Sequence, residues 1–275
     1  MRTMQTHTHD ISFAETEVRK RFLRWADGEA AREWACLKLI WTHAPGIAPR
    51  PLRLEKAGDH PVVVMERLAG TPLGGAPLSA AQTEALGRTL LRLHGIPTEV
   101  IEEAGLAERR LGPSTLPEAL RGWLCEQHDL SACHDPALIT AGIAAGAEWL
   151  AQPDALPAPE LSCLGIADLN PTNVLWDGRA CRLVDFEDGG LTDPAYDLAD
   201  HVEHIASRTH GVFDPETLGS AVGLSDGARE RMRAYRPLWA TFWLAMLLPG
   251  NGGFHRNPPG TTELQARHLL ALVAG

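Results

Sequence analysis

Two stretches of the sequence decide its fold: IADLNPTN at residues 166–173 and VDFEDGGLTDPAYDLAD at residues 184–200. The segments NVLW (residues 173–176) and ACRLVDF (residues 180–186) each overlap one of these stretches, and they flank the dipeptide Asp177-Gly178. Apolar and β-branched segments on either side of Asp-Gly are the pattern of a β-hairpin. The sequence therefore predicts a hairpin here, with polar residues at both of its open ends.

Three of these polar residues are candidate site residues. Asp168 and Asn173 come just before the first strand of the predicted hairpin, and Asp185 ends the second strand. Because a hairpin returns its ends to one place, we expect the three side chains to converge. Crowded carboxylate and amide oxygens suit a hard divalent cation such as magnesium. The sequence thus predicts a magnesium site at the mouth of the hairpin.

Length and composition define the class of protein. The chain has 275 residues, of which 44% are hydrophobic and 22% charged, as in ordinary globular proteins. The longest apolar run, residues 238–248, is shorter than the roughly 20 residues that span a bilayer. The first residues lack the pattern of a secretory signal, and five cysteines form no C-x-x-C pair. We expect a cytoplasmic protein with free thiols and no membrane partner.

Charge is distributed unevenly along the chain. Residues 1–70 carry 11 Lys and Arg against 9 Asp and Glu, whereas residues 71–275 carry 14 against 26. An acidic surface repels nucleic acid and favours cationic small molecules or metal ions. We therefore expect no nucleic-acid partner, and the oligomeric state stays open.

The first 70 residues are expected to form a small unit of strands and one helix. Residues 11–22 fit two short strands joined by a turn, residues 29–44 an amphipathic helix, and residues 62–65 a buried strand. The Gly- and Pro-rich residues 70–77 are expected to be a hinge or linker.

The rest of the chain is expected to be mainly helical. Ser79 is a candidate cap for a helix that ends near His94. Further helices are expected around residues 116–130, 136–151, 194–208, 226–249 and 261–274. The predicted fold is α+β and two-lobed, with an N-terminal lobe over residues 1–70 and a larger lobe over 71–275.

The motifs resemble those of the aminoglycoside phosphotransferase and choline kinase family. There the loop reads roughly His-Gly-Asp-Leu-His-Pro-Gly-Asn, and a second segment reads roughly Ile-Asp-Phe-(Glu/Gly)-Asp followed by Asp-Pro-x-x-Asp-Leu-Ala. Residues 166–173 and 184–200 are similar to both. The resemblance implies a protein-kinase-like fold and transfer of the γ-phosphate of ATP, with magnesium, to a hydroxyl of a small molecule.

The resemblance also implies roles for the motif residues. Asp168 would be the catalytic base that orients the acceptor hydroxyl, and Asn173 and Asp185 would hold magnesium on the ATP phosphates. Asp193 and Asp197 match the Asp-Pro-x-x-Asp-Leu-Ala segment, where they would brace the loop.

The resemblance extends to the nucleotide-binding part of the small lobe. Lys20 lies at the centre of VRKRF and would contact the phosphates, with Arg19 and Arg21 on the other face of the strand. Glu33 is the expected carboxylate partner of Lys20, and Glu29 is a second candidate.

The segment VVVMERLAG resembles the strand and hinge that offer backbone groups to adenine. Glu66 and Leu68 would lie at the edge of that nucleotide pocket.

Two departures from the family pattern keep other functions open. Ile166 and Asn170 stand where the family has histidines, and no Gly-rich loop precedes Lys20, since the first glycine is Gly28. A nucleotide-binding pseudokinase without turnover is therefore the alternative function. A metal-dependent hydrolase built on the same aspartates is a third, although it lacks the further histidine ligands typical of such sites.

Other clusters have less specific interpretations. Cys125, His128, Cys133 and His134 could suggest zinc, but their spacing fits no common structural site. His201 and His204 could be a metal pair, and a solvated or substrate-facing helix surface is the alternative that we favour.

Two further sets complete the expectations for the large lobe. The acidic charge there is consistent with a cationic acceptor such as an aminoglycoside or an amino alcohol. Candidate acceptor contacts near the motif are Asp188, Asp200 and Glu203. The stripe of apolar residues in the predicted helix 226–249 is assigned to packing: Trp239, Phe242, Trp243 and Met246.

Overall fold

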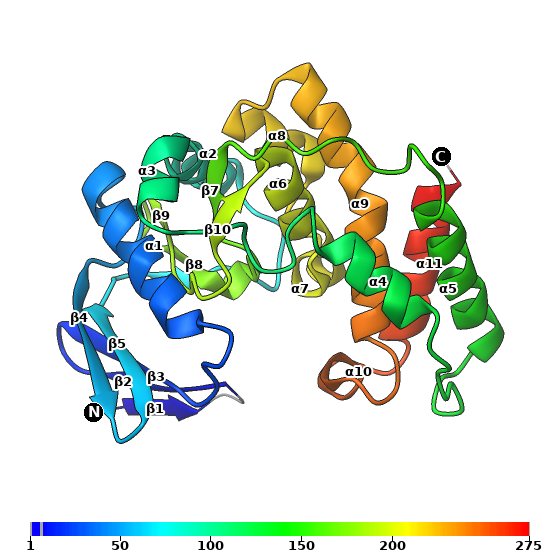
Figure 1. The fold of residues 1–275 in the computed structure, drawn as a ribbon, viewed down its shortest axis with the longest axis horizontal. Coiled ribbons are helices and arrows are strands. Elements are labelled where there is room, and N and C mark those ends of the chain that lie inside the picture. The colour runs from blue at the N-terminus through cyan, green and yellow to red at the C-terminus, as the bar shows by residue number, and fades with distance from the viewer. Residues whose placement is uncertain (1, 6–7, 275) are drawn as a thin grey trace.

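The computed structural model, which describes residues 2–5 and 8–274, has a small sheet-containing lobe and a larger, mainly helical lobe (Figure 1). The small lobe is a five-stranded antiparallel sheet in the order β1-β2-β3-β5-β4, with α1 packed against β4 and β5. The predicted two-lobed α+β fold is therefore confirmed. The elements of this lobe are β1 (Arg2–Gln5), β2 (His9–Phe13), β3 (Glu17–Phe22), α1 (Glu29–His43), β4 (Pro51–Ala57) and β5 (His60–Glu66).

Strand β3 lies inside the sheet, between β2 and β5. Side chains alternate across a strand, so Lys20 faces inward and is 4% exposed. Arg19 and Arg21 face outward, where they pair with Glu55 at 2.7 Å and with Asp10 at 2.5 Å. The expected division of the VRKRF side chains between two faces is confirmed.

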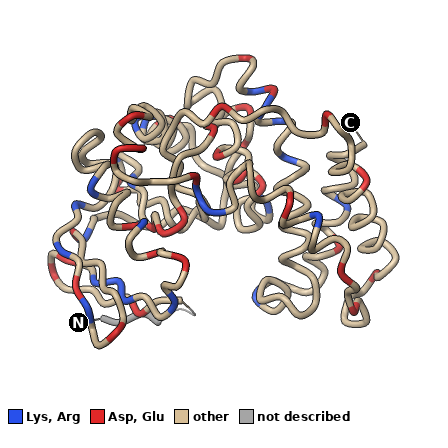
Figure 2. Tube along the Cα trace, viewed as in Figure 1, with Lys and Arg blue, Asp and Glu red and all other residues tan. Residues whose placement is uncertain are grey.

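Basic and acidic residues are interspersed along the strands of the small lobe (Figure 2). Arg53, for example, pairs with Glu17 across the sheet at 2.9 Å. Several cations of this lobe are thus paired with local carboxylates.

The helices of the large lobe pack around one another, most extensively α6 on α9 and α5 on α11. The capping box of Ser79 and Gln82 starts the first of them, as expected from the sequence. No helix in the described part of the chain is long and apolar enough to cross a membrane. The helices are α2 (Ala80–His94), α3 (Thr98–Glu103), α4 (Leu116–Leu124), α5 (Pro136–Leu150), α6 (Pro194–Glu203), α7 (Ile205–His210), α8 (Pro215–Val222), α9 (Asp226–Met246), α10 (Gly252–Arg256) and α11 (Thr261–Val273).

The predicted hairpin is present as β8 (Val174–Trp176) and β9 (Cys181–Leu183). Gly178 adopts a φ of 93°, and the Asp177 carboxylate accepts hydrogen bonds from the next backbone N–H groups. The second strand ends earlier than expected, because Asp185 has a φ of 75° and cannot continue a strand. A separate pair, β7 (Cys163–Gly165) with β10 (Gly190–Thr192), brackets the hairpin.

Residues 70–77, expected as a hinge or linker, begin as strand. β6 (Thr71–Pro72) pairs with β8, and the Leu73 N–H donates to the Val174 carbonyl at 2.8 Å. The Gly/Pro pattern correctly indicated a break in regular secondary structure, but hydrogen bonds hold the start of this segment to the hairpin.

Two expected helices differ in length. The helix expected over 194–208 is broken at His204, whose ψ of 129° is extended, so that α6 and α7 are separate. The helix expected over 116–130 ends at Leu124, because the residues that follow are polar and Asp129 forms a turn with Ser131. The short helices α3, α8 and α10 were not predicted.

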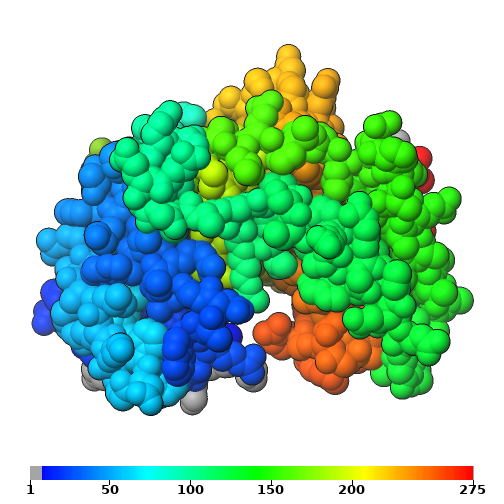
Figure 3. Space-filling view, viewed as in Figure 1, coloured from blue at the N-terminus to red at the C-terminus, as the bar shows by residue number. Residues whose placement is uncertain are grey.

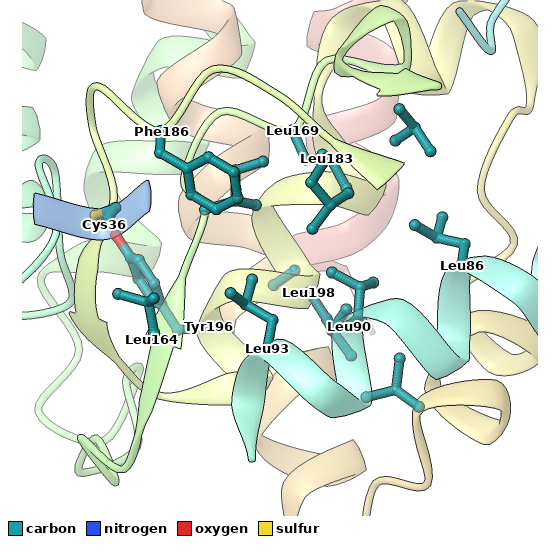
Figure 4. Close-up of a cluster of buried hydrophobic side chains, with 14 of the residues drawn as sticks. Cys36, Leu86, Leu90, Leu93, Leu164, Leu169, Leu183, Phe186, Tyr196 and Leu198 are labelled. Atoms are coloured by element: carbon teal, nitrogen blue, oxygen red, sulfur yellow. The ribbon is translucent and has the colours of Figure 1, made fainter. Parts of the chain in front are cut away.

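Apolar residues next to the two motifs anchor them in the main hydrophobic core (Figure 4). Leu169 follows Asp168, Phe186 follows Asp185, and both apolar side chains are fully buried. Trp239 of the predicted packing stripe is also buried in this core. The core therefore fixes the backbone on which Asp168 and Asp185 stand.

Candidate active site

One group of charged side chains joins the small lobe to the second motif. We call Lys20, Glu33, Asp185, Glu187 and His9 the Lys20 cluster. The Lys20 Nζ lies 2.7 Å from Glu33 Oε2 and 2.9 Å from Glu187 Oε2, and it also pairs with Asp185. His9 Nε2 lies 2.6 Å from Glu187 Oε2. The structure thus brings together Lys20, its expected partner Glu33 and the motif residue Asp185, whereas Glu29 makes no contact with Lys20 among the described interactions.

The Lys20 cluster holds one ammonium group against three carboxylates. Burial lowers the pKa of Lys20, but Asp185, Glu33 and Glu187 outweigh it and hold that pKa well above its ordinary value. Burial raises the pKa of Glu33 to about 6 despite the attraction of Lys20. For Glu187, burial is outweighed by His9 and Lys20, which lower its pKa to about 2. The excess of carboxylates over cations is an arrangement that a further cation would neutralise.

The residues present fit a hard divalent cation. Oxygen atoms of Glu33, Asp185 and Glu187 lie within 4.8 Å of one another. Glu33 is 1% exposed and committed to Lys20, whereas the Asp185 side chain is 38% exposed. The amide nitrogen of Asn173 donates to the Asp168 carbonyl at 3.5 Å, which leaves the amide oxygen as its ligand atom. Carboxylate and amide oxygens with an open side are the ligands that magnesium prefers.

The loop before the hairpin has an unusual backbone. Ala167 and Asp168 have φ values of 55° and 43°, a left-handed conformation that costs free energy for residues other than glycine. The Asp168 N–H donates to Asp200 Oδ2 at 3.2 Å, and the Val184 N–H donates to the Asn173 carbonyl at 2.9 Å. These bonds tie the loop to helix α6 and to the second motif.

The Asp168 carboxylate contacts His204 and is open to solvent. His204 Nε2 lies 3.1 Å from Asp168 Oδ1, and the Asp168 side chain is 62% exposed. The surrounding protein raises the pKa of Asp168, but the hydrogen bond with His204 and the charge of Arg109 outweigh this and lower it. Asp168 is therefore an ionised carboxylate that a small molecule can reach.

A second charged group lies in the interior of the large lobe. We call Arg109, Asp197, Asp200, His94 and His201 the Arg109 cluster. Arg109 lies 2.9 Å from Asp197 Oδ1 and 2.6 Å from Asp200 Oδ2. His201 and His94 approach Asp197 Oδ2 at 3.2 Å and 3.4 Å. Burial raises the pKa of Asp197, but His201, His94 and Arg109 outweigh it and hold it well below its usual range.

The Arg109 cluster supports the site without being open to it, since Asp197 and His201 are fully buried. Its link to the site is Asp200, which accepts both from Arg109 and from the Asp168 N–H. Asp197 contacts Arg109 and not the loop itself, so its bracing role stays a prediction. Asp193 caps α6 through the Ala195 N–H at 2.8 Å.

Several sequence expectations for the large lobe are wrong. Asp200 and Glu203 were candidate acceptor contacts, but both are buried, Asp200 against Arg109 and Glu203 against Arg236 at 2.6 Å. His201 and His204 are buried, so the solvated helix surface expected there is wrong. Asp188 is partly buried, lies 3.4 Å from Arg110, and stays a candidate acceptor contact.

The cysteine and histidine residues near 125–134 do not assemble. His128 contacts the Trp123 carbonyl at 3.1 Å instead. Within residues 2–5 and 8–274, the one group of three metal-ligating side chains found together is Glu33, Asp185 and Glu187. All five cysteines are free thiols, as expected.

Of the two expected adenine-edge residues, Glu66 ends β5 and Leu68 lies two residues after it. Glu66 Oε2 accepts a hydrogen bond from the Arg50 N–H at 3.3 Å, and the Arg67 N–H donates to the Thr16 carbonyl at 2.9 Å. For Leu68, the described residues provide no hydrogen-bond partner to its peptide groups. Separately, the surface is hollowed between the small lobe and α10 (Figure 3).

Sequence reasoning missed Glu187, His9 and Arg109 as members of these clusters, and it missed the contact of His204 with Asp168. Glu187 could have been found, since it lies in the second motif, two residues after Asp185. No local signal marks Arg109, because its partners lie about ninety positions further along the chain. Ile166, which replaces a family histidine, is a fully buried core residue.

A comparison with known families matches the chain over residues 5–235 to the phosphotransferase enzyme family. The matched range contains Lys20, both motifs and Asp168. The resemblance inferred from the sequence is therefore confirmed. No curated protein matches the sequence.

Solved structures share the fold at low sequence identity. A choline/ethanolamine kinase family protein from Mesorhizobium loti is 18% identical, with a TM-score of 0.67, over 100% of this chain and 88% of that one. A mutant of aminoglycoside phosphotransferase APH(4)-Ia, solved with AMP-PNP and hygromycin B, is 14% identical, with a TM-score of 0.66 over 99% and 92%. Choline kinase LicA from Streptococcus pneumoniae is 15% identical, with a TM-score of 0.62 over 98% and 91%. These similarities show the protein-kinase-like fold.

Proposed function

Because the chain belongs to the phosphotransferase enzyme family, we propose that it transfers the γ-phosphate of ATP to a hydroxyl group of a small molecule with the help of magnesium. The observation that carries the proposal is the direct pairing of Lys20 with Asp185, beside a loop that presents the exposed carboxylate of Asp168. A phosphate-binding cation, metal-binding oxygens and a base are the parts that phosphoryl transfer needs.

Lys20 would contact the phosphates of the nucleotide, and Glu33 would hold it in place. The 2.7 Å contact between them is buried, so the position of the ammonium group is fixed before ATP binds. Glu66 and Leu68 would lie at the edge of the adenine site, supported by the unpartnered peptide groups of Leu68 in the described chain. ATP as the donor is supported by AMP-PNP in the structure of APH(4)-Ia.

Asp185 and Asn173 would hold the magnesium ion. When bound, the ion would neutralise charge on the phosphate oxygens during transfer. The support is the excess of carboxylates around Lys20 and the open side of Asp185. Asp185 would then pair with both Lys20 and the ion.

Asp168 would orient the acceptor hydroxyl and take up its proton. The hydroxyl oxygen forms a bond to the γ-phosphorus, the bond from that phosphorus to the oxygen of ADP breaks, and the proton passes to the Asp168 carboxylate. The exposed carboxylate of Asp168 supports the orienting role, because an acceptor hydroxyl can reach it.

The acceptor is a small molecule, and we favour a cationic one such as an aminoglycoside or an amino alcohol. The support is the acidic charge of residues 71–275 and the exposed carboxylate of Asp168. Related folds include a spectinomycin phosphotransferase, a choline kinase and an aminoglycoside phosphotransferase solved with hygromycin B. We place the boundary between the nucleotide-binding and acceptor-binding lobes near Gly70 and the protein in the cytoplasm, where thiols stay reduced.

A nucleotide-binding pseudokinase is the second candidate function. The observation that favours it is Ile166, an apolar core residue at a position where the family has histidine. Retention of Lys20, Asp168, Asn173 and Asp185 together favours turnover instead.

The test is ADP release from ATP and magnesium against a panel of aminoglycosides, choline and other amino alcohols. We expect at least one acceptor to stimulate ADP release in the wild type, and Asp168→Asn to reduce that rate about a thousand-fold. ATP affinity should stay within about twofold, because Asp168 acts on the acceptor. Magnesium-dependent ATP binding without acceptor-stimulated release across the panel would favour the pseudokinase.

A further inference from the structure

The break between α6 and α7 places a buried histidine against the proposed base. His204 has an extended ψ of 129° between two helices and is 4% exposed. Its ring meets Trp243 edge to face, with centroids 4.6 Å apart. Burial and the tryptophan contact hold the imidazole in one orientation.

The contacts of the two ring nitrogens define the tautomer. The Ala206 N–H donates to His204 Nδ1 at 3.2 Å, so Nδ1 carries no proton. In a neutral imidazole the proton is then on Nε2, which lies 3.1 Å from Asp168 Oδ1. His204 therefore donates a hydrogen bond to Asp168 while its other nitrogen caps α7.

Asp168 needs such a partner. Its backbone is in a left-handed conformation, and its side chain is 62% exposed, so packing does not fix its rotamer. In the described chain, His204 is the one side chain that contacts the Asp168 carboxylate. Without that contact the carboxylate could rotate away from an acceptor.

We propose that His204 is a positioning residue for Asp168. Its Nε2–H holds Oδ1 of Asp168, so that Oδ2 is presented to the acceptor hydroxyl. The proton of the hydroxyl passes to Oδ2, and His204 keeps its hydrogen bond to Oδ1 throughout. This inference rests on the proposed phosphotransferase function and adds a residue that lies outside both motif stretches.

Two substitutions separate the two hydrogen bonds of His204. His204→Asn keeps an acceptor close to the Ala206 N–H but is too short to reach Asp168. His204→Gln can place an amide N–H near the position of Nε2 but does not cap α7 in the same way. His210→Asn is the matched control, since His210 is exposed at the end of the same helix.

We expect His204→Asn to lower kcat about 10- to 100-fold with the KM for ATP unchanged, because a small misplacement of a reacting group has an effect of this size. His204→Gln should recover most of the wild-type kcat, and His210→Asn should match the wild type. Full activity in His204→Asn, or greater loss in His204→Gln, would overturn the proposal and leave His204 as a helix cap.

The tautomer gives a readout independent of turnover. Long-range ¹H–¹⁵N spectra of the wild type should show His204 protonated at Nε2 alone, and Asp168→Asn should shift the Nε2 signal. A proton on Nδ1, or an unchanged signal, would overturn the proposal even if the enzyme is active. No turnover with any acceptor would contradict the proposed function, whereas turnover that is insensitive to His204→Asn contradicts only the positioning role.

Discussion

The Lys20 cluster and the Arg109 cluster are built from the same kinds of groups but differ in exposure and balance. In the Lys20 cluster one ammonium and one imidazole face three carboxylates, and the Asp185 side chain is 38% exposed. In the Arg109 cluster a guanidinium and two imidazoles surround two carboxylates, and no side chain is more than 7% exposed.

This difference assigns ligand binding to the Lys20 cluster and structural support to the Arg109 cluster. An exposed cluster with more carboxylates than cations is stabilised when a further cation binds. It is therefore suited to bind a metal ion and, through that ion, the phosphates of a nucleotide. A buried cluster whose carboxylates are all paired is not stabilised further by a ligand, and the protein loses stability when one partner is removed. Asp200 connects the two functions by holding the backbone of Asp168.

Asp185→Asn gives the largest expected effect and tests the open cluster. We expect kcat to fall by about a thousand-fold or more, because the metal loses a ligand. The melting temperature should stay unchanged or rise, since the substitution removes one of three crowded carboxylates. Steady-state kinetics and thermal unfolding measure the two quantities. An unchanged kcat with a lower melting temperature would mean that the Lys20 cluster supports the fold and does not bind the metal.

Asp197→Asn tests the closed cluster. Removing one partner of a buried ion pair should lower the free energy of unfolding by about 3 kcal/mol. Urea unfolding measures this loss, and the affinity for ATP in the folded variant should stay within about twofold of the wild type. A loss below about 0.5 kcal/mol, the size of a surface substitution, would show that the Arg109 cluster is not a support.

The pH dependence of stability follows from the low pKa of Asp197 in the folded protein. Above about pH 5 the carboxyl is ionised in both states, and its contribution is fully present. As the pH falls further, the unfolded chain takes up the proton first, so the free energy of unfolding decreases.

Urea titrations between about pH 6 and pH 3 should therefore show a steeper fall for the wild type than for Asp197→Asn. Asp59→Asn, in an exposed turn, is the matched control and should keep the wild-type slope. Equal slopes in all three proteins would mean that Asp197 is not held ionised by its partners.

Ala167→Gly gives the smallest expected effect. Ala167 adopts a φ of 55°, so glycine should relieve strain and stabilise the protein by up to about 1 kcal/mol. Gly165→Ala is the opposing variant, because its Cβ would lie 2.5 Å from Asp197 Oδ1 and from Thr192 Cγ2. Thermal unfolding compares both; destabilisation by Ala167→Gly would argue against strain in the loop.

Features close together in the sequence could be predicted, and those made by distant contacts could not. The Asp177-Gly178 turn and the motif spacing predicted the hairpin, and alternation in β3 predicted that Lys20 and Arg19 face apart. The partners of Arg109 are distant in sequence, so no pattern pointed to it.

The break at His204 was missed for the same reason. The residues around it favour a helix, and the break is held by contacts with Asp168 and Trp243 that form only in the folded chain. The roles of Asp168, Asn173, Asp185, Glu66 and Leu68 remain predictions, since they depend on ligands.

Calorimetric titration of ATP into the wild type and Asp185→Asn, with and without magnesium, tests most directly that the Lys20 cluster binds metal and nucleotide together. We predict that magnesium tightens ATP binding to the wild type by about tenfold or more and that Asp185→Asn loses this dependence. Equal affinity with and without magnesium in the wild type, or a magnesium effect that survives Asp185→Asn, would contradict the account.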